Sequence, residues 1–316
     1  MKIFIVGGAG YIGSHMVKIA HQAGHDVITV DNLSTGHQDA VLYGEFELCD
    51  ILDTAKLDKL FKKHAPDAVM HFSAYSLVGE SMTDPYKYYN NNVSGTLSLL
   101  KAMIDNDCMK FIFSSSAAIF GNPEYIPIDE NHPKNPINPY GKSKLMVEDI
   151  LKDFESAYGL KYVSFRYFNA AGHDPDGELS ERHDPETHLL PIIMQAANGQ
   201  RDAVSIFGND YNTIDGTCVR DYIHVNDLAN AHLRGLDYLN QNESYSAEFN
   251  LGNGNGFSVK EVIQQVKDIT GKDFKVLKEG RRNGDPSTLI ASDGKAKEIL
   301  NLKVNYSNLE DIIRTL

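Results

Sequence analysis

The sequence predicts an α/β protein whose first part is a doubly wound, mostly parallel sheet and whose second part is a smaller α/β domain. Short apolar strands alternate with helical segments over about the first 170 residues. A glycine-rich turn at residues 7–13 joins the first strand to the first helix. A later strand ends in the serines 114–116, and a tyrosine and a lysine follow them, one helical turn apart. These features indicate a ligand crevice at the carboxyl ends of the parallel strands.

Each element of this pattern can be placed on the chain. Apolar runs bounded by turn residues are typical of buried strands, and longer segments with helical spacing of apolar residues are typical of helices. Parallel strands joined by right-handed crossovers bury both faces of a sheet, so a Rossmann-type domain is expected. The predicted strands are residues 2–6, 27–30, 46–48, 68–72, 111–113 and 162–165, and the predicted helices run from the glycine turn to 23 and over 53–64, 84–106 and 139–158.

The alternation breaks after residue 169, and a second, smaller domain is expected there. Residues 170–188 are rich in Gly, Pro, Asp and Glu, which is typical of a long polar loop. We therefore expect one domain over residues 1–170 and another over residues 171–316, with segments near 219–250 that could return to the large sheet. The predicted elements of the second part are helices at 189–198, 226–239 and 258–270 and strands at 203–207 and 247–251.

The composition limits the classes of function. The 316 residues are 42% hydrophobic and 23% charged, as expected for one large or two unequal folded domains. The net charge is −13 and no dense Lys/Arg run is present, so neither nucleic acid nor an anionic membrane is an expected partner. No apolar run reaches the roughly 18 residues of a membrane span, and the apolar start is too short for a signal peptide, so the cytoplasm is expected. Cys49, Cys108 and Cys218 form no CxxC pair, which argues against a disulfide framework or a thiolate zinc site.

The first turn is predicted to bind a dinucleotide. Gly7, Gly10 and Gly13 follow the spacing GxxGxxG between a strand and a helix. Glycine lets the backbone turn tightly and approach a pyrophosphate, which the positive N-terminal end of the helix stabilises. A plain tight turn with glycine packing is the alternative. Asp31 ends the second strand, where an acidic residue accepts hydrogen bonds from the adenosine ribose hydroxyls.

The residues after Asp31 favour NAD over NADP as the cofactor. Residues 32–36 contain neither lysine nor arginine, and the carboxylate of Asp31 would repel a 2′-phosphate. Asp50 and Ile51, after the third strand, are expected to hold the adenine. The N-cap of the next helix would explain Asp50 as well.

Tyr140, Lys144 and Ser116 form the expected catalytic group. Tyr140 and Lys144 share one face of a helix that starts after Pro139, and Ser116 ends a strand. A phenol has a pKa near 10, and each unit by which that pKa is lowered needs about 1.4 kcal/mol of preferential stabilisation of the phenolate. A neighbouring ammonium and a positive nicotinamide ring can supply this in a partly dry site. An exposed Tyr–Lys pair without a function is the alternative.

In these residues the chain resembles the extended short-chain dehydrogenase/reductase superfamily and, within it, the UDP-glucose 4-epimerase family. The matching motifs run nearly from end to end, and the two in the variable second half are far more specific than a glycine turn. They are residues 7–15 (GGAGYIGSH), 31–33 (DNL), 78–81 (VGES), 88–95, 113–117 (FSSSA), 140–145 (YGKSKL), 166–169 (RYFN), 206–211 (IFGNDY) and 219–224 (VRDYIH).

The resemblance implies a reaction in which NAD stays bound and no net redox change occurs. By this resemblance Tyr140 takes the proton of the sugar 4-hydroxyl while hydride passes to the nicotinamide. Lys144 holds the nicotinamide ribose and lowers the pKa of Tyr140, and Ser116 orients the sugar oxygen. The 4-keto sugar then turns about its bonds to the diphosphate and receives the hydride on its other face. UDP-glucose and UDP-galactose would thus interconvert, as in galactose metabolism.

The resemblance also implies which residues contact the two ligands. Arg220 and Arg282 match diphosphate-binding arginines, whose planar group binds two oxygens, whereas Arg281 is expected to be solvated. The cofactor contacts implied are Gly7, Gly10, Tyr11, Ile12, Gly13, Asp31, Asn32, Leu33, Ser34, Thr35, Gly36, Asp50, Ile51, Phe72, Ser73, Ala74, Ser76, Asn91, Ser114, Tyr140, Lys144 and Phe168. The substrate contacts implied are Ser116, Tyr140, Asn169, His188, Leu189, Ser205, Phe207, Arg220, Arg282, Asp285 and Leu289.

Three positions depart from the family pattern. His188 stands where many members have Asn before Leu189, and Ser76 stands where some have Lys. Leu289 lies at the position that gates the sugar pocket, and we expect it to leave room for partial activity on N-acetylated UDP-sugars.

No metal site is expected. His183 and His188, with Asp184 and Glu186, lie in the polar loop without defined helical spacing, and their side chains are expected to be solvated. The chemistry implied by the resemblance needs no metal.

Two other functions are weighed against an epimerase. A sugar-nucleotide dehydratase or decarboxylase needs a carboxylate just after the catalytic serine, where this chain has Ala117 and Ala118. A non-catalytic dinucleotide sensor could keep the glycine turn, but it would have no reason to keep Ser116, Tyr140 and Lys144 together.

A homodimer is expected as well. The helices at 84–106 and 139–158 carry apolar residues on more than one face, and a surplus apolar face needs covering. The resemblance implies that these helices form a four-helix interface between two copies, and packing on their own sheet is the alternative. The apolar residues are Tyr89, Val93, Leu97, Leu100 and Met103 in the first helix and Leu145, Met146, Ile150 and Phe154 in the second.

Overall fold

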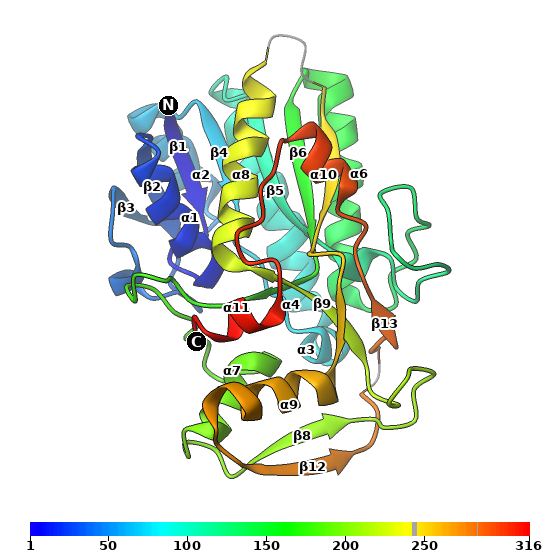
Figure 1. Cartoon of the computed structure of the whole chain (residues 1–316). Coiled ribbons are helices and arrows are strands. Elements are labelled where there is room, and N and C mark those ends of the chain that lie inside the picture. Colours follow the sequence, from blue (N-terminus) through cyan, green and yellow to red (C-terminus); the bar gives the residue numbers. More distant parts are fainter. Residues whose placement is uncertain (242–244, 283) are drawn as a thin grey trace.

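A parallel sheet of seven strands forms the centre of the molecule (Figure 1). The computed structural model describes residues 1–241, 245–282 and 284–316. The strand order is β10-β6-β5-β4-β1-β2-β3, and every neighbouring pair is parallel, which confirms the predicted doubly wound fold. The strands are β1 (Lys2–Val6), β2 (Asp26–Asp31), β3 (Glu45–Leu48), β4 (Ala68–His71), β5 (Lys110–Ser116), β6 (Lys161–Tyr167) and β10 (Ala247–Leu251).

Helices cover both faces of this sheet because alternate residues of each strand point to opposite sides. In β1, Ile3 and Ile5 belong to one apolar cluster, and Phe4 and Val6 belong to another on the opposite face. The first cluster is completed by α1 (Tyr11–Gln22), α8 (Val225–Asn240) and α10 (Gly294–Ile299). The second is completed by α2 (Thr54–His64), α5 (Thr96–Asp105) and α6 (Pro139–Tyr158).

The second part of the chain lies beyond the carboxyl ends of these strands, at the bottom of Figure 1. It has its own apolar cluster and two small sheets, one in the order β11-β9-β13 with β7 beside β9, and one of β8 and β12. Its strands are β7 (Asn169–Ala171), β8 (Ala203–Phe207), β9 (Val219–His224), β11 (Gly256–Ser258), β12 (Lys275–Glu279) and β13 (Thr288–Leu289). Its helices are α7 (Leu189–Ala197), α9 (Val259–Thr270) and α11 (Leu309–Ile313).

The chain returns to the large sheet after β9. Helix α8 packs on α1, β10 extends the sheet beside β6, and α10 packs against β10. β9 itself stays in the small sheet between β11 and β13. Strands β9 and β12 were not predicted, because their sequences VRDYIH and KVLKE place charged residues within the strand and hide the apolar pattern.

The helix predicted over residues 84–106 is interrupted, and this correction bears on the crevice. The segment consists of α4 (Pro85–Tyr88), the π-helix η2 (Tyr89–Gly95) and α5, and the short helix α3 (Val78–Thr83) precedes it. The side chain of Asn92 explains the local distortion. It accepts from Tyr75 N (3.0 Å) and donates to Tyr75 O (3.0 Å) and to Ser143 Oγ (3.1 Å). Two short 3₁₀ turns complete the description, Gln38–Ala40 and Ala117–Ile119.

Most apolar residues of α5 and α6 pack within the same chain. Leu100 and Met103 are fully buried, and Val93, Ile150 and Phe154 pack against the same cluster. Leu145 packs beneath the crevice, and Leu97 and Met146 are exposed by 39% and 46%. The surplus apolar face is therefore narrower than the sequence suggested. Separately, no helix in the described part of the chain has the length and apolar character needed to cross a membrane.

Candidate active site

A cavity of about 390 Å³ lies where the carboxyl ends of the large sheet face the second part of the chain. We call it the first cavity. Most of the residues expected to contact a cofactor line it: Gly7, Gly10, Tyr11, Ile12, Gly13, Asp31, Asn32, Ser34, Thr35, Gly36, Phe72, Ser73, Ala74, Ser76, Asn91, Ser114, Tyr140, Lys144 and Phe168. So do many of the expected substrate contacts: Ser116, Tyr140, Asn169, His188, Arg220, Asp285 and Leu289.

The glycine turn of this cavity leaves no room for side chains at two of its positions. A Cβ at Gly7 would lie 2.5 Å from Ser73 N, and one at Gly13 would lie 2.1 Å from Gly7 O. Gly10 differs, because the nearest atom to a Cβ there is Gly7 O at 3.4 Å. Gly10 is also the N-cap of α1, and no described side chain caps this helix end. The turn thus presents free backbone N–H groups and a positive helix end to the cavity, which suits a pyrophosphate.

Asp31 ties the end of β2 to this turn. Its carboxylate accepts hydrogen bonds from Ala9 N (3.0 Å) and Leu33 N (2.8 Å). Burial raises the pKa of Asp31, and these backbone N–H groups oppose the rise. Asp31 lines the cavity and each carboxylate oxygen has a second lone pair, so the residue suits the hydroxyls of a ribose.

Three residues expected to contact the cofactor do not line the first cavity. Leu33 has a positive φ of 59° and donates its N–H to Asp31. Asp50 accepts from the side chain of Asn32 (2.8 Å) and from Leu52 N (2.8 Å), so it supports the loop that carries Asn32. Ile51 is buried in the apolar cluster against α2 and α5. Asp50 thus lies next to a residue that lines the cavity, and the expected adenine contacts of Asp50 and Ile51 remain a prediction.

Ser116, Tyr140 and Lys144 meet in the first cavity. Asn138 caps α6 by accepting from Gly141 N (2.8 Å), and Pro139 occupies the first turn of this helix. A Cβ at Gly141 would lie 2.4 Å from Ala118 O, so glycine allows the start of α6 to approach the end of β5. Tyr140 and Ser116 are hydrogen bonded through their side chains as a result.

Lys144 lies one turn further along α6, nearly out of contact with solvent. It is 3% exposed, and its ammonium donates to Ser114 O at 2.6 Å. The nitrogen lies 5.9 Å from the centre of the Tyr140 ring and 4.9 Å from that of Phe113. Burial without a carboxylate partner lowers the pKa of Lys144 to about 7.

The phenol of Tyr140 is a weaker acid than a free tyrosine in the protein alone. Burial raises the pKa of Tyr140, and the hydrogen bond from Ser116 opposes that rise. The low pKa expected from the sequence is therefore not a property of the residues by themselves. It needs a further positive charge in the cavity.

A second cavity of about 720 Å³ adjoins the first. It contains Leu189 and Arg282, which the first cavity does not, and it shares Asn169, His188 and Asp285 with it. Arg282 stacks on the Phe207 ring at 3.7 Å, so Phe207 holds this arginine although it lines neither cavity among the described residues.

Arg220 lines the first cavity beside Asp285, which lines both cavities. Its guanidinium contacts Asp285 Oδ1 at 3.4 Å and donates to Val219 O at 2.9 Å. Ser205, the remaining expected substrate contact, is on β8 and lines neither cavity in the part of the chain that the structure describes.

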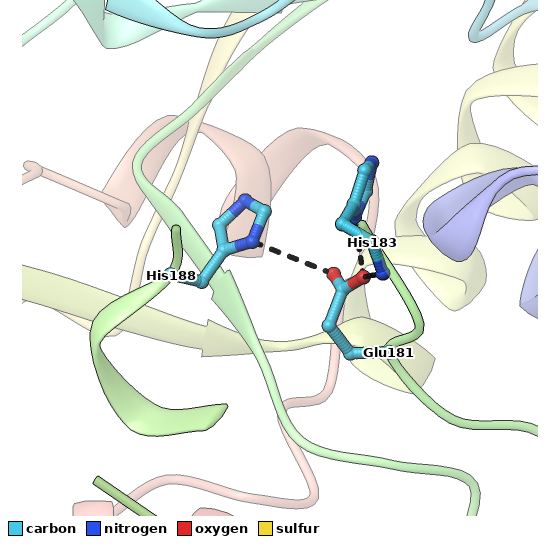
Figure 2. Close-up of side chains that lie close together, drawn as sticks. All are labelled: Glu181, His183 and His188. Atoms are coloured by element: carbon cyan, nitrogen blue, oxygen red, sulfur yellow. Dashed lines mark hydrogen bonds and ion pairs between the residues drawn. The ribbon is translucent and has the colours of Figure 1, made fainter. Parts of the chain in front are cut away.

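The loop between β7 and α7 brings a further group of residues to the first cavity, which corrects one expectation (Figure 2). His183 and His188 both line the cavity and both contact Glu181. The side chains of Glu181 and Glu186 are 2% and 5% exposed, so these carboxylates are buried rather than solvated. The carboxylate that contacts both histidines is that of Glu181, and not that of Asp184 as the sequence suggested. The spacing of these residues along the chain did not indicate this contact.

Sequence reasoning also missed parts of the cavity wall. Tyr75 lines it from the loop after β4, and Val78 lines it from α3. Asn138 lines it as well, and it caps α6. The sequence does contain a signal for Asn138, because Asn before Pro is typical of a helix start. The other two are ordinary apolar or aromatic residues, and the backbone of Tyr75 is held by Asn92 of the π-helix.

Comparison with known proteins decides the family. The profile of the NAD dependent epimerase/dehydratase family matches residues 3–252. The chain belongs to this family. A curated UDP-glucose 4-epimerase from Halalkalibacterium halodurans is 51% identical over 313 residues, which cover 99% of this chain and 93% of that relative.

Solved structures agree over the whole fold. A UDP-glucose 4-epimerase from Brucella ovis in complex with NAD has a TM-score of 0.96 and 50% identity, covering 99% of this chain and 96% of that one. The UDP-Glc/GlcNAc 4-epimerase from Campylobacter jejuni has a TM-score of 0.86 and 43% identity, covering 99% and 97%. The glycine turn, the uncapped end of α1 and Asp31 fit the cofactor that the family uses.

Proposed function

We propose that this protein is an isomerase that interconverts UDP-glucose and UDP-galactose by epimerisation at C4, with tightly bound NAD. The observation that carries the proposal is the meeting of Ser116, Tyr140 and Lys144 in one cavity with the glycine turn. The relatives of similar length are UDP-glucose 4-epimerases, and the large-sheet geometry of this chain is the same as theirs.

The residues that would hold NAD are those of the glycine turn, with Asp31 at the ribose. The uncapped N-terminal end of α1 suits the pyrophosphate, and Asp31 suits the adenosine ribose. Lys144 is placed to hold the second ribose from the floor of the cavity. The chemistry that bound NAD supplies is reversible acceptance of a hydride from C4 of the sugar.

In the proposed mechanism Tyr140 exchanges a proton with the sugar 4-hydroxyl. Ser116 donates to the same region and fixes the direction of the sugar oxygen. A phenolate at Tyr140 and an ammonium at Lys144 stabilise each other, so the two groups titrate as a pair. The 4-keto sugar formed in this step must present its other face before the proton returns from Tyr140.

The diphosphate must be held while the sugar turns, and the second part of the chain supplies the charges for it. Arg220 and Arg282 flank the shared edge of the two cavities, and guanidinium groups bind phosphate oxygens in pairs. Asp285 holds Arg220 in position, and Asn169 offers an amide at the same edge. We assign these residues to the nucleotide part of the substrate.

Elimination chemistry is a weaker proposal. Ala117 and Ala118 occupy the positions after Ser116 and line the cavity. The acidic residues of its described lining are Asp31, which binds the glycine turn, and Asp285, which binds Arg220. Neither residue directly follows Ser116 in the sequence, as the acid of a dehydratase would. Among the described residues, the cavity therefore has no carboxylate in the position that elimination of water requires.

A further substrate class is supported by Leu289. This half-buried residue lines the first cavity, and a leucine leaves more space than the tyrosine of narrower family members. A structure 43% identical to this chain is described as a UDP-Glc/GlcNAc 4-epimerase. We therefore include partial activity on N-acetylated UDP-hexoses in the proposal.

The quaternary state and the compartment complete the proposal. We infer a homodimer through α5 and α6, supported by the exposed Leu97 and Met146 and by the family resemblance. A cytoplasmic location is supported by three buried, unpaired cysteines, Cys49, Cys108 and Cys218, which fit a reducing compartment.

One experiment tests the reaction directly. Purified protein is incubated with UDP-galactose and no added NAD, and the products and the absorbance spectrum of the protein are recorded. We expect UDP-glucose to form and the spectrum to show a nicotinamide that stays with the protein. A requirement for stoichiometric external NAD would contradict an epimerase and would favour a dehydrogenase.

A further inference from the structure

The loop that follows β7 holds two histidines against one buried carboxylate. Figure 2 shows the carboxylate of Glu181 between the rings of His183 and His188. The Nδ1 atom of His183 contacts Glu181 Oε1, and that of His188 lies 3.7 Å from Glu181 Oε2. All three potential ligand atoms lie within 4.8 Å of one another.

One oxygen of this carboxylate is unsatisfied. Glu181 Oε1 accepts from His183 N at 2.9 Å as well as contacting the His183 ring. Glu181 Oε2 is buried and has no hydrogen-bond partner in the described part of the chain, and the whole side chain is 2% exposed. A buried carboxylate oxygen without a donor is unfavourable, because it has lost its hydration and gained no hydrogen bond in return. The atom is aimed at His188, beyond hydrogen-bond distance.

Two other clusters of acidic and histidine residues in the protein already contain a lysine. Lys18 lies 2.7 Å from Asp174, Asp176 and Glu178. Lys63 contacts Glu47 beside His64.

Glu181 and Glu186 have no such partner. Within the described residues, their ion pairs are with His183 and His188 alone. Of the three clusters, the one formed by Glu181, His183 and His188 is therefore the one without a lysine in contact with its carboxylates.

The spacing and the donor atoms fit a transition-metal cation. Zn²⁺ binds imidazole nitrogen and carboxylate oxygen at about 2.0–2.2 Å, so neighbouring tetrahedral ligands are about 3.3 Å apart. The distance of 3.7 Å between His188 Nδ1 and Glu181 Oε2 is close to that value. Glu186 Oε1 lies 2.8 Å from the same nitrogen and is fixed by the N–H groups of Thr187 and His188. It holds this ring in the metal-free protein, and it lies close enough to become a ligand once the incoming cation has displaced the proton of Nδ1.

We propose that Glu181, His183 and His188 bind a divalent transition-metal cation of the Zn²⁺ class. Both histidines coordinate through Nδ1 in the neutral form, so a ring that carries two protons releases one to solvent on binding. Glu181 contributes the oxygen that lacks a hydrogen bond, and a solvent molecule or Glu186 completes the coordination. The proposal replaces the expectation from the sequence that this loop binds no metal.

The site has a consequence for the neighbouring cavity. His183 and His188 line the first cavity, so a cation bound to both would place a charge at the wall of that cavity and would occupy ring nitrogens that a ligand there could otherwise contact. If the proposed function is correct, on which this consequence rests, Zn²⁺ lowers the affinity for the UDP-hexose. The binding of Zn²⁺ itself does not depend on the reaction.

Equilibrium dialysis with Zn²⁺ alone tests the site. Metal-free full-length protein without a polyhistidine tag is compared with His183→Gln, His188→Gln and Glu181→Gln variants. His21→Gln is the matched control, because His21 is exposed and stacks on Tyr43. We expect one tightly bound Zn²⁺ per wild-type chain, retained in the control, and at least about tenfold weaker binding in His183→Gln and His188→Gln.

Two results would overturn the proposal: no stoichiometric Zn²⁺ on the wild-type protein, or undiminished binding in both histidine variants. His183 has a side chain that is 30% exposed, so its variant tests the site even if Glu181→Gln does not fold. Turnover of UDP-galactose with and without Zn²⁺ is measured on the same samples. An inactive protein that still binds Zn²⁺ would contradict the proposed function and leave the metal site intact.

Discussion

The two sides of the first cavity differ in how they hold their charges. On the large sheet, Lys144 is 3% exposed and contacts backbone and aromatic rings. On the other side, the side chains of Arg220 and Asp285 are 13% and 30% exposed, and Arg282, in the adjoining second cavity, is exposed. A proton transfer needs groups whose environment is fixed and dry, because their pKa values must be tuned. A diphosphate that enters and leaves needs accessible charges that lose little hydration on binding.

The first way to test this division is to remove the phenol. We expect Tyr140→Phe to lower turnover of UDP-galactose by about 10²–10⁴-fold, the usual contribution of a general acid–base group. The bound NAD should remain, because Tyr140 is one of many residues around the cofactor space. Single-turnover kinetics and the nicotinamide absorbance measure the two quantities. A variant with near wild-type turnover would assign the protein to the sensor class instead.

The second test measures how the buried Lys144 affects the stability of the protein, and not its activity, as the pH changes. Burial lowers the pKa of Lys144 from 10.5 to about 7. Between pH 7 and pH 10.5 Lys144 carries a proton in the unfolded chain that it lacks in the folded protein. The contribution of Lys144 to the free energy of unfolding therefore increases as the pH rises through this range. Lys144→Met removes that dependence.

The free energy of unfolding of the wild type minus that of Lys144→Met should therefore increase with pH, by at most about 1.4 kcal/mol per pH unit. Urea unfolding at pH 7 and pH 9, of protein from which the bound NAD has been removed, measures this difference. A difference that stays constant or falls over this window would show that Lys144 remains charged in the folded protein. The conclusion that the large-sheet side of the cavity holds its charges in a dry environment would then be wrong.

The third test compares two neighbouring arginines. We expect Arg282→Ala to raise KM for UDP-galactose about tenfold or more, because a hydrogen bond to a charged group contributes about 1.5–3 kcal/mol. Its kcat should change less, since Arg282 lies in the second cavity, away from Tyr140. Arg281→Ala is the control, because Arg281 binds Asp210 at 2.7 Å and stacks on Tyr211. Equal effects of the two substitutions would contradict the assignment.

The smallest effect is expected for substrate choice. Leu289→Tyr should lower the turnover of UDP-N-acetylgalactosamine relative to UDP-galactose by several-fold, because added bulk in a pocket costs about 1–3 kcal/mol for the larger ligand. Both substrates are assayed on both proteins at saturating concentration. Complete inactivity of the wild type on the N-acetylated sugar would refute the prediction for Leu289.

The sequence was informative wherever a function depends on local spacing. GxxGxxG between a strand and a helix needs no distant residue to be recognised, because the turn itself requires glycine at Gly7 and Gly13. Tyr140 and Lys144 share a face through the pitch of one helix. The ends of parallel strands meet by the rules of the fold, so Ser116 and Asp31 could be assigned to one crevice before the structure was known.

The tertiary structure decided everything that depends on a loop folding back. Asp50 accepts a hydrogen bond from Asn32, which lines the cavity, and Ile51 packs in the apolar cluster that includes α5, two contacts that the sequence did not indicate. Glu181 joins His183 and His188 because the loop that carries them is fixed from far away along the chain. One such tie is the ion pair between Lys18 and Asp174.

The amino-acid sequence alone thus determined the parallel sheet, the glycine turn and the meeting of Ser116, Tyr140 and Lys144 in one cavity, since short-range periodicity and sterics specify each of them. The tertiary structure alone decided which side chains of the second part face a cavity, because contacts between residues more than 100 positions apart have no local pattern. Arg282 and Ser205 illustrate the difference: the resemblance implies a substrate contact for both, yet Arg282 lines a cavity and Ser205, among the described residues, does not.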